Sequence, residues 1–228
     1  SDTAGNEAYG EDGNDVLAGG SQGDFLHGDD GDDTLFGADG GDFLFGGDGH
    51  DVLIAGNFDY ADNAGNTLYG EGGDDQLYGG SFGDTLSGGD GNDYLYGKGG
   101  NDSLFGEAGD DLYDVEDVGD VVVEAADAGI DTVVTSLDFY TLGENVENLL
   151  LEGAVGLVGY GNALDNYLRG NGAVNTLYGF AGNDLLDGSG GGDAMYGEEG
   201  DDTLRFDITD LVIDGGSGTD TARFDAFN

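Results

Sequence analysis

The sequence predicts an all-β protein, a parallel β-solenoid in which nine residues form half a coil. A glycine-rich turn that ends on aspartate, followed by a three-residue strand, recurs every nine residues, as in 46–54 (GGDGHDVLI) and 88–96 (GGDGNDYLY). A short fixed period of this kind sets the architecture of the whole stack. A helical alternative is disfavoured because a glycine inside a helix costs about 1 kcal/mol relative to alanine. Residues 18 apart should therefore lie one above the other.

The strand of each repeat predicts the core. In a three-residue strand the middle side chain points to one face and its neighbours to the other, and the middle residue stands at place eight of the repeat. Place eight is almost always aliphatic, and we expect it to face inward. It is filled by Leu17, Leu26, Leu35, Leu44, Leu53, Leu68, Leu77, Leu86, Leu95, Leu104, Leu168, Leu177, Leu186, Met195, Leu204 and Ile213.

Charge restricts the partners of the chain. The 228 residues include 50 Asp and Glu against 4 Lys and Arg, a net charge of -46. Binding to nucleic acid or to an anionic membrane surface is not expected. Acidity with 50 glycines favours disorder, yet 37% of residues are hydrophobic and in register with the repeat. We therefore expect folding to depend on cations. No stretch is apolar enough for a membrane-spanning segment.

The repeat frame divides the sequence into three parts. Residues 1–123 form a first block with a six-residue insertion at 55–60, and 161–228 form a second block with a C-terminal cap. Between them, 124–160 is richer in Val, Leu and Glu, and we expect it to continue the solenoid with longer, β-rich rungs; a linker is the alternative. The first residues lack Met and the features of a signal peptide, which predicts that the chain is part of a longer protein.

Place six of the repeat, where the glycine-rich turn ends, is usually aspartate. These aspartates predict a ladder of metal sites. Coils about 4.8 Å apart would bring aspartates together in pairs that repel by roughly 3 kcal/mol each. A Ca²⁺ ion, with oxygen ligands at about 2.3–2.6 Å, fits between them; Mg²⁺ and Zn²⁺ fit less well. The alternative is that the aspartates solubilise turns or bind backbone amides. The predicted ligands are Asp15, Asp24, Asp33, Asp42, Asp51, Asp75, Asp84, Asp93, Asp102, Asp111, Asp120, Asp184, Asp193, Asp202 and Asp220.

Some levels of this ladder should be weaker. Eight aspartate pairs stand 18 residues apart, so we expect roughly eight or more ions. Asparagine at place six removes a charge, and Leu211 cannot ligate through its side chain. The insertion at 55–60 should also interrupt the array. Turns with glycine at place five instead of four should hold ions less well; they contain Gly23, Gly65, Gly83, Gly119 and Gly192.

Place nine is often aromatic and should face outward. Tyr78 and Tyr96, like Tyr178 and Tyr196, are 18 residues apart and should stack. One interpretation is that such pairs stabilise the sheet face. The other is a docking surface for an extracellular glycan, a second copy of the chain or a missing catalytic domain.

The glycine and aspartate pattern resembles the RTX (repeats-in-toxin) family, the hemolysin-type calcium-binding nonapeptide repeats of secreted bacterial proteins. The resemblance implies a right-handed parallel β-roll with calcium between successive turns on both edges. It also implies type I secretion and a secreted or cell-surface location. We expect a structural or adhesive portion of a larger protein; the alternative is an accessory module of a secreted enzyme or toxin. No catalysis is expected, because His27 and His50 lack a partner base and no serine stands in a triad.

Overall fold

The computed structural model describes residues 5–57 and 62–225 and shows two compact units, Ser1–Gly129 and Ile130–Asn228. Every regular element among the described residues is a β-strand, and none of them forms a helix that could cross a membrane. The insertion expected at 55–60 falls partly outside the described residues, which omit 58–61.

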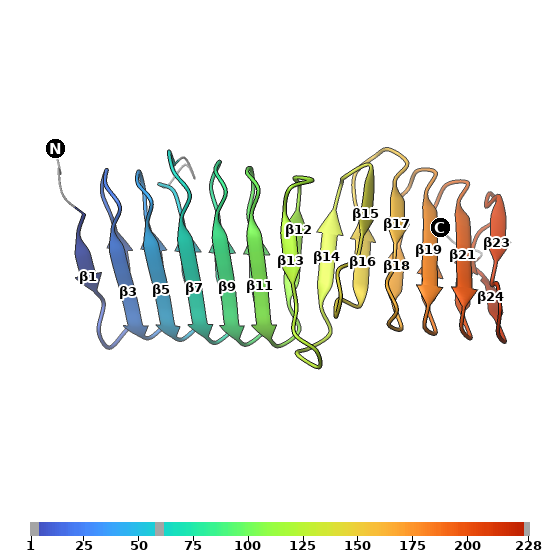
Figure 1. The fold of residues 1–228 in the computed structure, drawn as a ribbon, viewed down its shortest axis with the longest axis horizontal. Coiled ribbons are helices and arrows are strands. Elements are labelled where there is room, and N and C mark those ends of the chain that lie inside the picture. Colours follow the sequence, from blue (N-terminus) through green and yellow to red (C-terminus); the bar gives the residue numbers. More distant parts are fainter. Residues whose placement is uncertain (1–4, 58–61, 226–228) are drawn as a thin grey trace. The chain divides into compact units, whose positions relative to one another are not determined.

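The first unit is a roll of two parallel sheets in which consecutive strands alternate between the sheets. Figure 1 shows the strands of one of them, from β1 to β11, side by side. We call them the odd and the even sheet. The odd sheet holds β1 (Glu7–Tyr9), β3 (Phe25–Asp30), β5 (Phe43–Asp48), β7 (Thr67–Gly72), β9 (Thr85–Asp90), β11 (Ser103–Ala108) and β13 (Val121–Val123). The even sheet holds β2 (Val16–Ala18), β4 (Thr34–Phe36), β6 (Val52–Ile54), β8 (Gln76–Tyr78), β10 (Tyr94–Tyr96) and β12 (Leu112–Val115).

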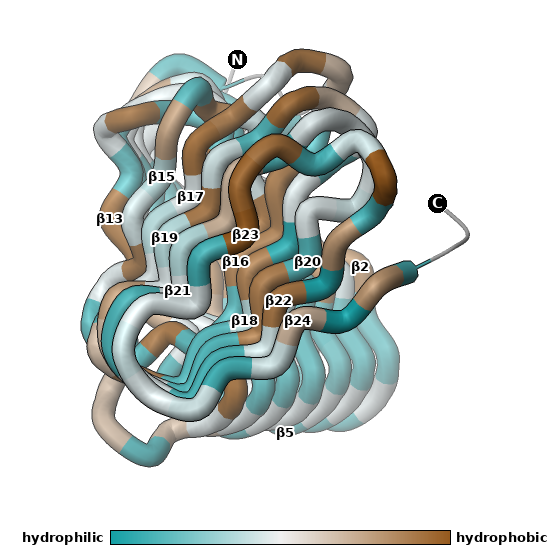
Figure 2. The backbone as a smooth tube through the Cα atoms, turned by 90° about the vertical axis from the view of Figure 1, so that its right-hand side faces the viewer, coloured by the Kyte–Doolittle hydropathy of each residue, from teal (hydrophilic) through white to brown (hydrophobic). Residues whose placement is uncertain are grey.

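The second unit repeats this arrangement, and Figure 2 shows its turns and strands stacked coil upon coil. One of its sheets holds β14 (Thr132–Thr135), β16 (Asn148–Leu151), β18 (Tyr167–Arg169), β20 (Leu185–Asp187), β22 (Thr203–Phe206) and β24 (Thr221–Phe224). The other holds β15 (Phe139–Thr141), β17 (Val158–Tyr160), β19 (Thr176–Ala181), β21 (Ala194–Glu199) and β23 (Val212–Asp214). The predicted all-β parallel β-roll is confirmed.

Strand register explains the core of the roll. Leu35 pairs with Leu53 and Leu95 with Leu77, so place eight lies directly over place eight in each sheet. Most of these leucines are fully buried, as predicted. Near the end of the second unit the pattern weakens, since Ile213 is 36% exposed. Coils without the glycine-rich turn have other lengths: Val133 pairs with Leu149, and Leu149 with Leu168.

The insertion does not interrupt either sheet. Across it, Leu53 pairs with Leu77 and Leu44 with Leu68, a step of 24 residues in place of 18. The strands thus stay in register across 55–60, and the loss of ions expected there stays a prediction. The turns on both sides of the insertion keep their alignment, because Asp51 N–H still donates to Asp75 Oδ1 at 2.7 Å.

Candidate metal centres

Two columns of turns in the first unit carry the place-six side chains. The column that precedes the even strands, which we call the first edge, presents Asp15, Asp33, Asp51, Asp75, Asp93 and Asp111. The column that precedes the odd strands from β3 on, the second edge, presents Asp24, Asp42, Asn66, Asp84, Asp102 and Asp120. In the second unit the corresponding turns present Asn166, Asp184, Asp202 and Asp220 on one edge, and Asn175 and Asp193 on the other.

One carboxylate oxygen of each aspartate joins neighbouring coils. The Asp33 N–H donates to Asp51 Oδ1 at 2.7 Å, and Asp24 N–H to Asp42 Oδ1 at 2.7 Å. The same bond spans the insertion, from Asp51 N–H to Asp75 Oδ1 at 2.7 Å. The second unit has it between Asp184 and Asp202 at 2.8 Å. The alternative interpretation, hydrogen bonding to backbone amides, thus accounts for one of the two oxygens.

The other oxygen has no such explanation. A buried carboxylate oxygen without a hydrogen bond or a cation is costly, because the charge has lost its hydration. Within the described parts of the chain, Oδ2 is buried and accepts no hydrogen bond in Asp33, Asp42, Asp51, Asp75, Asp93, Asp102, Asp184, Asp193 and Asp202. These oxygens are the strongest indication of cation sites in the structure.

Glycine at place one makes room for these oxygens. A Cβ atom added at Gly28 would lie closer than 3.0 Å to both Asp33 Oδ2 and the carbonyl oxygen of Gly46, one coil on. Gly46 stands in the same relation to Asp51 and Gly70. A carboxylate oxygen and a backbone carbonyl thus converge in these turns, and both are preferred ligands of Ca²⁺. The residues present therefore fit calcium.

Backbone conformation assigns the other glycines of the turn. Left-handed φ angles occur at places two and four, for example at Asp29 (72°) and Gly31 (136°). Glycine meets this requirement without strain at place four and, in some turns, at place two, as in Gly47 (115°), since left-handed backbone disfavours residues with a Cβ. Place one is not left-handed; its glycine is required by the close approach of the two oxygens.

Burial changes the acidity of the ladder. It raises the pKa of Asp75 to about 8 and that of Asp102 to about 7, and neighbouring aspartates add to the rise while backbone N–H donors oppose it. Burial also raises the pKa of Asp51 and Asp93 to about 6. In the metal-free roll these groups thus keep their protons to a higher pH than an ordinary aspartate does, and a calcium ion must compete with protons for them.

Two turns of the second edge are built differently. Asp24 Oδ2 accepts a hydrogen bond from Gly20 N–H at 2.6 Å, and Asp84 Oδ2 from Gly80 N–H at 2.7 Å. In these two turns a glycine stands at place five, as Gly23 and Gly83, and place four is not glycine. The turn with Gly192 does not belong with them. Its place four is Gly191, with φ at 135°, and its Asp193 Oδ2 accepts no hydrogen bond.

The structure shows how the coils join at Leu211 and places three predicted ligands at less enclosed levels. Leu211 is 74% exposed, and the Asp193 N–H donates instead to Asp210 Oδ1 at 3.0 Å. Asp210, one residue out of phase, thus takes over the link between coils, while its Oδ2 accepts Asp207 N–H at 2.7 Å, and the absence of a complete ion at this level stays a prediction. Asp15 and Asp120 are only half-buried and Asp220 is exposed, so these lie at less enclosed levels.

A buried polar pair at the end of the first unit was missed from sequence. Tyr113 occupies place eight, where leucine is usual, and is fully buried. Its hydroxyl donates to the carboxylate of Glu124, which is 8% exposed and stands at place one, where glycine is usual. Both residues depart from the repeat, at places eight and one, and these departures are the sequence signal that could have revealed the pair.

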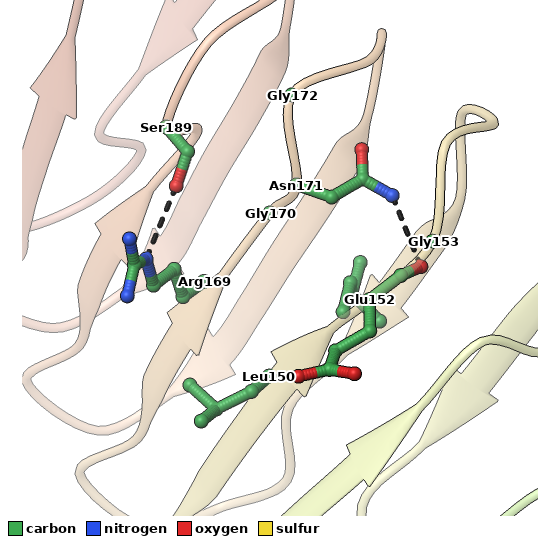
Figure 3. Close-up of a pocket in the computed structure, with 9 residues that line it drawn as sticks. Leu150, Glu152, Gly153, Arg169, Gly170, Asn171, Gly172 and Ser189 are labelled. Carbon is green, nitrogen blue, oxygen red and sulfur yellow. Dashed lines mark hydrogen bonds between the residues drawn. The ribbon is translucent and has the colours of Figure 1, made fainter. Parts of the chain in front are cut away.

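The pocket shown in Figure 3 offers no catalytic arrangement. It has a volume of about 390 Å³ in the second unit and is lined by Glu152, Arg169, Asn171 and Ser189 beside glycines and leucines. Arg169 Nε donates to Ser189 Oγ at 3.2 Å, and Asn171 Nδ2 donates to the Glu152 carbonyl at 3.2 Å. Glu152 is its one carboxylate, and no histidine or cysteine is among its lining residues.

The stacked glycine turns, with buried carboxylate oxygens that accept no hydrogen bond, define this chain as a calcium-binding β-roll. The model of the RTX calcium-binding nonapeptide repeat (four copies) matches residues 9–44, 27–59, 60–86, 78–113, 87–121 and 160–195. The matches cover more than half of the chain, and the protein belongs to this family. Among curated proteins, none matches the chain.

Proposed function

We propose that calcium binding in the turns folds this chain, and that the folded roll is a structural element of a larger secreted or cell-surface protein. The observation that carries the proposal is the set of buried Oδ2 atoms that accept no hydrogen bond, such as those of Asp33, Asp75 and Asp184. When these aspartates are charged, the negative charge on each buried Oδ2 needs a cation to stabilise it. With a net charge of -46, the chain has too few Lys and Arg to supply those cations itself.

Calcium concentration would make the fold depend on the compartment. An ion present at ten times its dissociation constant stabilises the folded state by about 1.4 kcal/mol per site. Extracellular calcium modules bind at about 10⁻⁴–10⁻³ M, far above cytosolic concentrations. We therefore infer that the chain stays unfolded inside the cell, is exported as an extended chain through a type I system, and folds outside. The proposed role is structural or adhesive and not enzymatic.

The aromatic residues on the outer face support a structural role. Tyr9, His27, Phe45 and Tyr69 stack along the odd sheet with ring centroids 4.8, 4.6 and 5.2 Å apart. In the second unit Tyr178 stacks on Tyr196 at 4.8 Å. Stacked rings cover one another's faces, which are the surfaces that sugars use. Glycan binding and self-association are thus the less favoured roles for these ladders.

The segment 124–160 fits the same structural role. Residues from Thr132 to Tyr160 form four strands that pair in parallel with their neighbours in the second unit. We propose that this segment continues the solenoid between the two repeat blocks and is not a linker.

Far-UV circular dichroism and native mass spectrometry of the full chain test the proposal. In millimolar calcium we expect a β spectrum and several bound ions; in excess EGTA we expect a disordered spectrum and no ions. A control titration with EGTA already saturated with calcium excludes an effect of the chelator itself. Native β structure that persists in excess EGTA contradicts the proposal.

A further inference from the structure

The glycine-rich turns that end on the place-six aspartate adopt two conformations in the first unit. In the open conformation φ is left-handed at places two and four and Oδ2 accepts no hydrogen bond, as in the turn of Asp42, where Ala38 and Gly40 have φ of 76° and 138°. In the closed conformation neither place is left-handed and the place-two N–H donates to Oδ2, as in the turns of Asp24 and Asp84. The first edge is open at Asp33, Asp51, Asp75 and Asp93.

The closed turns satisfy their carboxylates without a metal. Asp84 accepts Asn66 N–H at 2.6 Å and Asn66 Nδ2 at 3.1 Å on Oδ1, and Gly80 N–H at 2.7 Å on Oδ2. Asp24 accepts Asn6 N–H at 2.5 Å and Gly20 N–H at 2.6 Å. A carboxylate with two or three N–H donors is stabilised in its charged form. Both oxygens of these two carboxylates thus accept an N–H, whereas in the open turns only Oδ1 does.

The residue at place four decides between the conformations. Open turns place glycine there, whereas the closed turns place Gln22 and Phe82, for which left-handed backbone costs about 1–2 kcal/mol. Place two does not decide, because the closed turns carry Gly20 and Gly80 and yet do not use left-handed φ, while Asp29 and Glu71 adopt it in open turns.

We infer that the two edges of the first unit are unequal calcium arrays: each open turn contributes one ion, and the turns closed at Asp24 and Asp84 contribute none. The inference rests on the proposed function and specifies which of its sites bind. The second edge is then held at these levels by its own backbone amides. The number of ions in the unit is set by how many turns have glycine at place four.

Removal of one charge at each kind of turn gives the first test. Asp42→Asn and Asp84→Asn change equally buried residues of the same edge. By native mass spectrometry and calorimetric titration with Ca²⁺, we expect Asp42→Asn to bind one ion fewer than the unchanged chain and Asp84→Asn to bind the same number. Equal losses in both variants overturn the inference.

The second test opens a closed turn by substitution of Phe82, its place-four residue. The substitution should leave the core intact, because Phe82 is 47% exposed. We expect Phe82→Gly to bind one additional ion, and the matched control Phe82→Ala to bind none, because alanine removes the same ring without favouring left-handed backbone. No additional ion in Phe82→Gly overturns the inference while the calcium-dependent fold stands. Absence of calcium binding in the unchanged chain instead refutes the proposed function.

Discussion

At the scale of single residues, the two oxygens of the place-six aspartate have separate roles. Oδ1 connects one coil to the next through a backbone N–H, for example between Asp75 and Asp93 at 2.8 Å. Oδ2 lies beside the place-one glycine and a carbonyl of the next coil. The aspartate is therefore a structural link and, in our proposal, a metal ligand as well, which would explain why this place varies so little along the repeat.

A methyl group at place one should displace the ligand oxygen. We predict that Gly46→Ala lowers the free energy of unfolding in calcium by about 1–3 kcal/mol and weakens calcium binding, because its Cβ would meet Asp51 Oδ2 and the Gly70 carbonyl. Gly190→Ala is the control, since a Cβ at Gly190 meets no atom within 4 Å. Denaturant titrations in calcium compare the two, and equal stability in both variants would contradict this assignment of place one.

Acidity should partly replace calcium. Burial raises the pKa of Asp75 from 3.8 to about 8 and that of Asp42 to about 6, so the metal-free folded state binds more protons than the unfolded chain in this range. Stability without metal is therefore present below about pH 4 and is lost as the pH rises through about 6–8.

Circular dichroism in EGTA across that range measures this effect. We expect β structure near pH 4–5 that disappears by pH 8, and β structure at pH 8 only when calcium is added. Light scattering is the control, because the sequence pI is about 4.1 and aggregation must be excluded. A metal-free spectrum that gains β structure as the pH rises would reverse the predicted sign.

At the scale of strands, register and not strand length holds the roll together. Three-residue strands such as β8 and β10 pair side chain to side chain, so that leucine lies on leucine inside and aromatic rings lie along the outer face. The insertion between β6 and β7 shows that an added loop is tolerated when the register on both sides is kept.

The outer aromatic ladder should stabilise its sheet. Tyr178 stacks between Tyr160 and Tyr196, at 5.2 and 4.8 Å. We predict that Tyr178→Ser lowers the free energy of unfolding in calcium by about 1–2 kcal/mol and leaves the number of bound ions unchanged. A pull-down with insoluble polysaccharide accompanies the denaturation measurement. Unchanged stability together with lost polysaccharide binding would favour a docking role over a structural one.

At the scale of the whole chain, general charge repulsion and specific ligand demand are separate obstacles to folding. Exposed acidic side chains contribute to the net charge of -46, and dissolved salt screens them. The enclosed Oδ2 atoms are different, because they need a ligand with a defined geometry.

Monovalent salt should therefore not replace calcium. We predict that about 1 M NaCl in EGTA, where the screening length is about 3 Å, leaves the chain without its β spectrum. Mg²⁺ should be much weaker than Ca²⁺, since it requires shorter bonds and a strict octahedron. Recovery of the full β signal in NaCl alone would show that screening, and not site binding, controls folding.

Periodicity was sufficient to predict the parallel roll, the leucine core at place eight and the aspartate ladder at place six, because each follows from the two-residue alternation of a strand and from a constant coil length. The contact of Asp193 with Asp210, the unbroken register across 55–60 and the closed turns at Asp24 and Asp84 became apparent only in three dimensions. These features depend on local φ angles and on which amide of the next coil reaches an oxygen. Hydrogen bonds select among such arrangements after the coils have stacked, and a nine-letter pattern does not contain that choice.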